Sequence, residues 1–165
     1  MVVALAGSLA ACGGGSQAAS IGTTYTDPEG AYTLQVDPAW DLQVGGFAEG
    51  VEIWFLGPVE GGFRPNVNLL TQSAPGMDLA GYTAASIRSA PSAISDFQLV
   101  SSTRIEPELG VMEYRGTAQG RHLHFLAIFG IRSGRATIAT LTSPEETFAG
   151  WRATVEPFLR TLRLT

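Results

Sequence analysis

Short stretches of alternating apolar and polar residues dominate this chain from residue 23 onward. In residues 31–36 the side chains of Tyr32, Leu34 and Val36 fall on one side of an extended backbone, and polar or small residues separate them. Such alternation with a period of two predicts a half-buried strand. Residues 51–56 alternate as well, and further strands are predicted over residues 66–71, 97–105, 110–117, 122–131 and 136–141.

One helix is predicted between the third and fourth of these strands, over residues 78–89. Asp78 can cap its first turn, because a short carboxylate side chain accepts hydrogen bonds from the free backbone N–H groups there. Leu79, Tyr82 and Ile87 then give a loose apolar face, and Pro91 favours an end soon afterwards.

A second helix is predicted at the end of the chain. Ser143, Pro144 and Glu146 have the spacing of a capping box, with proline at the first helical position. Pro157 should kink or split this helix, because proline removes one backbone hydrogen bond and crowds the preceding turn. The apolar stripe of the helix comprises Phe148, Trp151, Val155, Phe158, Leu159 and Leu162.

The order of the predicted elements is strands, a helix, an antiparallel meander and a final helix. Residues 118–121 and 132–135 are typical of hairpin turns within the meander. Segregated runs of this kind indicate an α+β domain, in which helices flank a mostly antiparallel sheet. We expect one such domain, over residues 23–165.

The N-terminal stretch predicts export and a lipid anchor. Residues 2–11 have the length of a secretory apolar region and are too short to span a bilayer. The sequence Leu9-Ala10-Ala11-Cys12 resembles a bacterial lipobox, in which the cysteine is acylated and becomes the new N-terminus. We therefore expect a signal peptide over residues 1–11. No basic residue precedes Cys12, although a signal needs one, so the natural start is expected upstream of Met1.

The predicted anchor also fixes the expected location, outside the cytoplasm on the cell membrane. Two or three acyl chains on Cys12 would hold the protein stably at the bilayer. Residues 12–22 would then be the acylated cysteine and a flexible linker, since Gly, Ser, Ala and Gln prevail there. Cys12 is the single cysteine, so no disulfide can form within the chain.

The amino-acid composition limits the classes of function that this chain can have. Hydrophobic residues make up 45% of the chain, as in a globular protein, and the formal net charge is −5. This acidic balance, with arginines scattered along the sequence, argues against a nucleic-acid partner.

Candidate catalytic chemistry is sparse. His122 and His124 are the only histidines, and in a strand they would project from the same face. Glu113 on the neighbouring strand could join them in a metal site, or the two histidines could simply be polar residues on a partly solvated face. We expect no metal, no cofactor and no catalytic residue, because no motif for a nucleophile or a phosphate loop accompanies them.

Three motifs resemble the PsbP-like domains. Residues 25–34 followed by Pro38-Ala39-Trp40 resemble their opening, and Phe63-Arg64-Pro65-Asn66-Val67-Asn68 resembles the strand that follows. The closing strand, acidic turn and amphipathic helix also fit. Together with the lipobox, the chain looks most like actinobacterial lipoproteins of the LpqN/LpqT type. The resemblance implies an α-β-α sandwich without recognised catalytic residues.

A candidate partner-binding surface comprises Trp54, Phe63 and Arg64, since aromatic residues and arginine are enriched at interface hot spots. If helices cover both faces of the sheet, Trp54 is instead part of the core. We expect a non-enzymatic binding or assembly module for another envelope macromolecule. The alternatives are a carrier of an apolar envelope lipid, which needs a deep apolar cavity, and a hydrolase, which needs a nucleophile beside His122 or His124.

Overall fold

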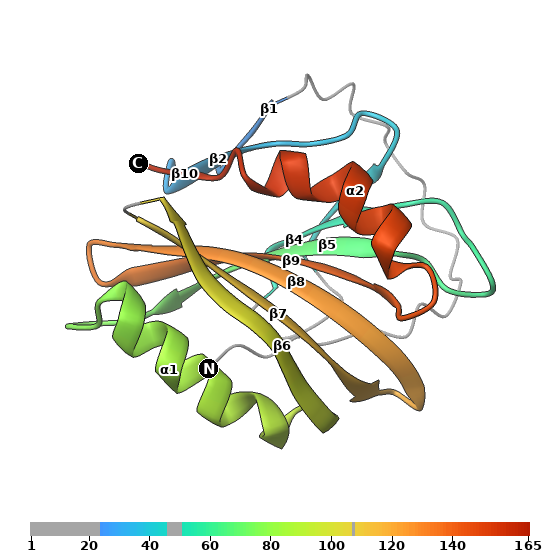
Figure 1. Cartoon of the computed structure of the whole chain (residues 1–165). Coiled ribbons are helices and arrows are strands. Elements are labelled where there is room, and N and C mark those ends of the chain that lie inside the picture. The colour runs from blue at the N-terminus through green and yellow to red at the C-terminus, as the bar shows by residue number, and fades with distance from the viewer. Residues whose placement is uncertain (1–23, 46–50, 107) are drawn as a thin grey trace.

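The computed structural model describes residues 24–45, 51–106 and 108–165. A large antiparallel sheet forms its central layer, with a helix on one face and a second helix plus a small sheet on the other (Figure 1). The α+β class and the flanking helices predicted from the sequence are therefore confirmed. The predicted signal peptide and linker, including Cys12, lie outside the described residues.

Seven strands build the large sheet, in the order β3-β4-β5-β9-β8-β7-β6, and every neighbouring pair is antiparallel. The strands are β3 (Asp41–Val44), β4 (Ile53–Leu56), β5 (Asn66–Ser73), β6 (Ser95–Glu106), β7 (Leu109–Ala118), β8 (Arg121–Arg132) and β9 (Arg135–Pro144). All predicted strands in this part of the chain are present, whereas the short β3 was not predicted.

Two tight turns connect the long strands of the meander. Gln119 and Gly120 have φ angles of 52° and 73°, and Ser133 and Gly134 have φ angles of 51° and 72°. Two consecutive residues with positive φ are typical of type I′ turns, whose twist matches that of antiparallel strands. The predicted hairpin turns are therefore confirmed.

A small sheet and the second helix cover one face of the large sheet. The small sheet has the order β1-β2-β10, and α2 (Phe148–Leu159) lies beside it (Figure 1). Its strands are β1 (Thr24–Thr26), β2 (Tyr32–Gln35) and β10 (Arg163–Leu164). Beneath them lies a core that includes Tyr32, Phe55, Leu69, Leu126, Val155 and Leu159.

The opposite face is covered by α1 (Leu79–Ser89), which a short 3-10 helix (Ala90–Ser92) follows. Asp78 caps α1 as predicted, since its Oδ1 accepts a hydrogen bond of 2.7 Å from the Gly81 N–H. The ring of Tyr82 packs against that of Phe129, with 5.4 Å between ring centroids. Both faces of the sheet are therefore buried.

The start of α2 differs from the prediction. The helix begins at Phe148 after Thr147, and no side chain caps it. Ser143 instead belongs to β9, where it is fully buried and pairs with His124 of β8. The predicted capping box is wrong because cross-strand pairing extends β9 as far as Pro144.

Pro157 does not split α2, which runs unbroken from Phe148 to Leu159. The proline is exposed and lies within the last turn of the helix. Because proline has no backbone N–H, one hydrogen bond is missing there, close to the C-terminal end of the helix. The predicted split is therefore wrong, whereas the alternative, a kink, stays a prediction. Neither of the described α-helices is long and apolar enough to cross a membrane.

Candidate functional site

Trp54 is buried in the core. Its side chain is 3% exposed and belongs to the apolar cluster on the α1 side of the sheet, while Ile53 and Phe55 face the α2 side. Both faces of β4 are covered. Under this condition we expected Trp54 to be part of the core. Trp54 is thus not available to a partner at the surface. The candidate partner-binding surface is therefore reduced to Phe63 and Arg64.

The loop of residues 57–65, between β4 and β5, is a closed turn. Glu60 and Phe63 exchange two backbone hydrogen bonds, of 2.8 Å and 2.9 Å. Between them Gly61 and Gly62 have φ angles of 57° and 72°. Glycine adopts this left-handed backbone without the steric cost that a Cβ would add, so the glycine pair allows the tight reversal.

Side chains hold this loop to the rest of the domain. Arg64 donates from Nε to the Gly57 carbonyl at 2.7 Å, and its guanidinium pairs with Asp41 of β3. Glu60 accepts a hydrogen bond of 3.0 Å from the indole N–H of Trp151 on α2. Arg64 therefore fixes the loop to the domain through Nε and Nη2, and its contact with a partner stays a prediction.

Phe63 packs against the edge of the apolar cluster on the α1 side of the sheet. Phe63 is half-buried, and the guanidinium carbon of Arg121 lies 5.9 Å from its ring centroid. Such a cation–π contact positions both groups. Val59 on the same loop is 71% exposed. The loop thus carries an exposed apolar side chain and a half-buried aromatic ring that contacts a cation, on a backbone that internal hydrogen bonds close.

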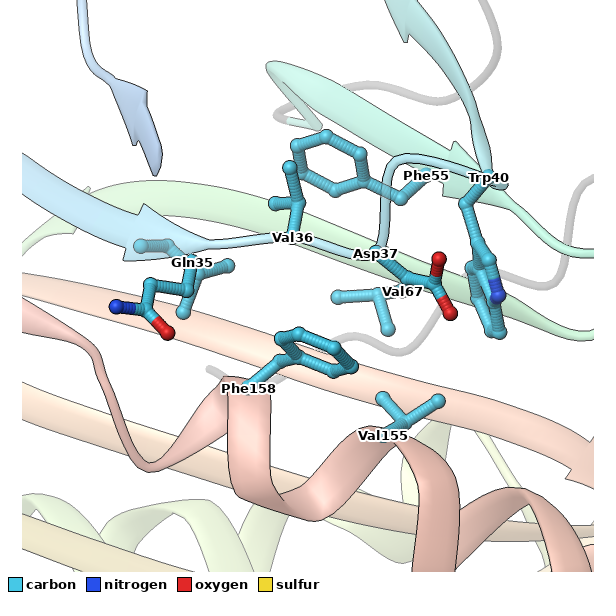
Figure 2. Close-up of a pocket in the computed structure, with 9 residues that line it drawn as sticks. Gln35, Val36, Asp37, Trp40, Phe55, Val67, Val155 and Phe158 are labelled. Atoms are coloured by element: carbon cyan, nitrogen blue, oxygen red, sulfur yellow. The ribbon is translucent and has the colours of Figure 1, made fainter. Parts of the chain in front are cut away.

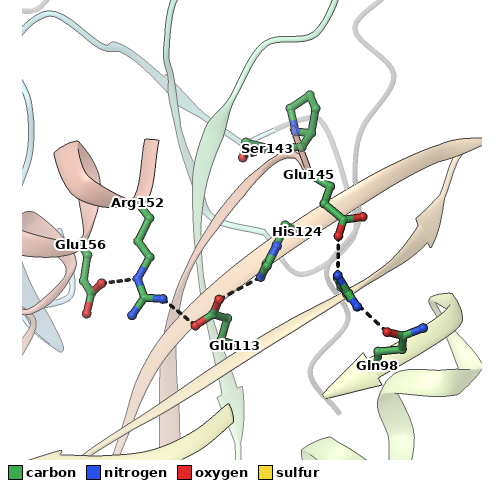
Figure 3. A network of polar contacts seen from close by, with 9 residues as sticks. Gln98, Glu113, His124, Ser143, Glu145, Arg152 and Glu156 are labelled. Carbon is green, nitrogen blue, oxygen red and sulfur yellow. Dashed lines mark hydrogen bonds and ion pairs between the residues drawn. The ribbon is translucent and has the colours of Figure 1, made fainter. Parts of the chain in front are cut away.

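A buried carboxylate lies beneath α2, at the centre of a polar network (Figure 3). Glu113 of β7 is 7% exposed. Its Oε1 lies 2.9 Å from His124 Nε2, and its Oε2 accepts from Arg152 Nη1 at 2.7 Å. Arg152 also donates from Nε to Glu156 at 2.7 Å. The buried negative charge is therefore paired on both of its oxygens.

The environment of His124 favours its neutral form. Its ring stacks on that of Phe148 with 3.7 Å between centroids and an angle of 2° between planes. Burial lowers the pKa of His124, and this effect outweighs the opposing influence of Glu113. His124 thus joins α2 to the sheet through an aromatic contact on one side and a hydrogen bond on the other.

His122 does not take part in this network. It is exposed, and its Nδ1 lies 3.2 Å from the hydroxyl of Thr117. The proximity of Glu113 and His124 was anticipated from the sequence, whereas the part played by Arg152 was not. In the described ranges no group of three or more His, Cys, Asp or Glu side chains is arranged to hold a metal ion.

Ser143 is the hydroxyl residue directly opposite His124 in the sheet. Ser143, His124 and Glu113 are the residue types of a hydrolytic triad, but their arrangement differs from that of a triad. Ser143 is fully buried, and its hydroxyl donates to the Pro144 carbonyl at 3.3 Å. A triad serine must be hydrogen-bonded to its histidine and open to the substrate.

A solvent-open apolar pocket lies between α2, the segment after β2 and the sheet (Figure 2). Its empty volume is about 270 Å³, including the part open to solvent. The lining residues are Leu34, Gln35, Val36, Asp37, Trp40, Phe55, Val67, Val155 and Phe158. Sequence reasoning missed this pocket because its walls come from segments as far apart in the chain as Leu34 and Phe158.

No family model matches the sequence, and a comparison with curated proteins found no match. The structure, however, is similar to several solved ones. Cyanobacterial PsbP (CyanoP) from Synechocystis sp. PCC 6803 superimposes with a TM-score of 0.64 at 18% identity, with 95% of this chain and 99% of that chain covered.

Two further structures share the arrangement. LpqN of Mycobacterium tuberculosis, described as involved in cell envelope biogenesis, gives a TM-score of 0.55 at 11% identity and covers 87% of this chain and 90% of its own. PA94 of Pseudomonas aeruginosa, described as a putative regulator, gives a TM-score of 0.55 at 20% identity and covers 81% of this chain and 92% of its own. At these identities the likeness concerns the fold, and it shows that the chain has the PsbP-like fold.

Proposed function

We propose that this protein is a membrane-anchored envelope lipoprotein of the LpqN/LpqT type, from an actinobacterium, and that it binds another envelope macromolecule without catalysing a reaction. The lipobox around Cys12 supports the anchor and a location outside the cytoplasm. The fold is shared with LpqN, a protein described as involved in cell envelope biogenesis, which agrees with that location.

The observation that carries the binding role is the ordered 57–65 loop. Its backbone is closed by the Glu60–Phe63 pair, and its side chains are held by Asp41 and Trp151. Order in the free protein lowers the entropy lost on binding. The loop leaves Val59 exposed, and it also carries Phe63, whose ring contacts Arg121. Aromatic rings and arginine are among the residue types that contribute most at interfaces.

Site-specific photo-crosslinking in membranes of the native host tests this proposal. A photoreactive amino acid at position 59 should give a discrete crosslinked protein adduct. The matched control is position 100, because Val100 is 49% exposed on β6, at the opposite edge of the sheet from β3. The adduct should be absent there, and it should be lost from position 59 when Arg121→Glu is added. Identical adducts at both positions would contradict the proposed surface.

A lipid carrier is the second candidate function, and the apolar pocket is the observation in its favour. Its empty volume of about 270 Å³ includes space that is open to solvent, so the pocket is a shallow apolar hollow and does not enclose a whole lipid. Mass spectrometry of protein extracted from the native membrane separates the two functions, since a carrier would retain one lipid at fixed stoichiometry.

A further inference from the structure

Arg121 is held in one place by the loop of residues 57–65. Its Nη2 donates a hydrogen bond of 3.3 Å to the Gly62 carbonyl, and its guanidinium carbon lies 5.9 Å from the ring centroid of Phe63. Arg121 is also the first residue of β8, so the tight turn between β7 and β8 fixes its backbone. The side chain therefore joins the hairpin to the loop, although 59 residues separate Arg121 from Gly62.

The positive charge of Arg121 is not neutralised by any described residue. The arginines that pair with a carboxylate are Arg64, Arg115, Arg132, Arg135, Arg152 and Arg160. Arg121 is exposed, and within the described ranges its single polar acceptor is the Gly62 carbonyl. A guanidinium carries N–H donors on each of its nitrogens, so those on Nε and Nη1 are available to a group from outside the chain.

A partner that packs on the 57–65 loop would also cover Arg121, because the guanidinium lies against Phe63 and Gly62 of that loop. Covering a charge without an opposite charge costs free energy, whereas a charge-assisted hydrogen bond between the two sides offsets that cost. On the basis of the proposed partner surface, we infer that the partner places the carboxylate of an aspartate or glutamate against Arg121. This carboxylate accepts hydrogen bonds from Nε or Nη1, while Phe63 and the Gly62 carbonyl keep the guanidinium in position.

A single carboxylate fits this surface better than a polyanion does. The chain has a formal net charge of −5, so a surface with many phosphate groups would be repelled. The loop instead supplies the Phe63 ring against Arg121, and Val59 of the same loop is 71% exposed. An arginine surrounded by contacts that exclude water is typical of interface hot spots. The expected partner is therefore a protein with an acidic residue among apolar ones.

The chain contains no lysine, which permits a direct chemical test of this contact. Arg121→Lys keeps the positive charge and gives the full-length protein a single side-chain amine. In membranes of the native host, a water-soluble carbodiimide links that amine to a carboxylate only where the two groups touch. Tandem mass spectrometry should locate the new amide bond on an aspartate or glutamate of the protein that position 59 captures by photo-crosslinking.

Arg163→Lys is the matched control. Like Arg121, Arg163 is exposed, donates to backbone carbonyls and forms no ion pair among the described residues. It lies on β10, and the adjacent Leu164 accepts a hydrogen bond from Arg132 at the other end of β8. The amine introduced at position 163 should therefore give no amide bond to this partner.

Removing the charge at position 121 provides a second measurement. Arg121→Gln should lower the yield of the position-59 photo-adduct about tenfold, because the carboxylate of the partner is then left without its cation. Arg121→Lys should keep that yield within about twofold, since the positive charge remains. Arg163→Gln should leave the yield unchanged.

Amide bonds to the partner from the amines at both positions would overturn the proposal, as would a carboxylate of this same chain as the group that reacts. An unchanged photo-adduct yield in Arg121→Gln would also overturn it. If position 59 captures the partner but the amine at position 121 forms no amide bond with it, the carboxylate contact fails and the partner surface stands. If position 59 captures nothing in the unsubstituted protein, the partner surface fails and the carboxylate contact fails with it.

Discussion

Arg152 on α2 donates a hydrogen bond of 2.7 Å to the buried carboxylate of Glu113 on β7, although 39 residues separate the two in the chain. Apolar contacts through Phe148, Val155 and Leu159 would hold the helix on the sheet in several similar positions. The charged hydrogen bond is directional, so it selects one position and one orientation of the helix.

Glu113→Gln should destabilise the domain by about 2 kcal/mol, because the amide keeps the shape but loses charge-assisted hydrogen bonds to His124 and Arg152. Urea unfolding followed by tryptophan fluorescence measures the change. The control is Glu108→Gln, whose exposed pair with Arg132 spans 3.8 Å and should contribute less than about 0.5 kcal/mol. Equal effects of the two substitutions would show that the network does not hold α2.

Stability should fall as the pH drops below about 6.5, the ordinary pKa of histidine. Burial holds the pKa of His124 below that value in the folded state, so the unfolded chain takes up the proton first. The folded state is then progressively disfavoured until the pH reaches the folded pKa. His124→Gln should remove this slope between about pH 7.5 and 5.5, as unfolding curves at each pH will reveal. A slope that persists in the variant assigns the effect to another group.

The meander was predictable because apolar-rich segments of strand length are joined by turns that contain glycine. The start of α2 was not predictable, since the Ser143-Pro144-Glu145-Glu146 pattern favours a helix start and only the pairing with β8 places Ser143 and Pro144 in β9. The short β1 and β10 have too few residues to show a period. The contact between Glu113 and His124 followed from strand pairing, while the third member, Arg152, depends on how α2 docks, which no local pattern reveals.

The two predicted helix caps should respond differently to alanine. Asp78→Ala should cost about 1 kcal/mol, because Asp78 accepts a hydrogen bond from the first turn of α1. Ser143→Ala removes no cap, and its hydroxyl only donates a long hydrogen bond of 3.3 Å to the adjacent residue. Its effect on the free energy of unfolding should therefore be less than half as large. Thermal unfolding of both variants measures the two effects. A larger loss of stability for Ser143→Ala than for Asp78→Ala would contradict the prediction.

Trp151 should contribute less to stability than a fully buried tryptophan. It is half-buried, its ring centroid lies 5.7 Å from that of Trp40, and its indole N–H donates to Glu60. Trp151→Ala should cost about 2 kcal/mol, below the 3–5 kcal/mol typical of core aromatic residues. Trp151→Phe should restore most of this through the retained ring contact. Denaturant midpoints that are identical for the two variants would show that the ring itself adds nothing.

Cys12→Ala in the precursor should abolish acylation and stop cleavage after Ala11, because the modified residue is the thiol itself. Mass spectrometry of protein extracted from the native membrane measures both. Ser16→Ala, in the same linker, serves as the control and should be processed normally. An unmodified Cys12 at the mature N-terminus in the native host would contradict the lipobox assignment.

The pairing of β10 with β2 sets an order of assembly. Arg163 and Leu164 pair with Thr33 and Tyr32, so the first hairpin of the described domain gains its third strand from residues synthesised some 130 positions later. Closing so long a loop is entropically costly and slows folding. During synthesis the hairpin therefore emerges early, yet it stays without its third strand until the segment after α2 has followed it.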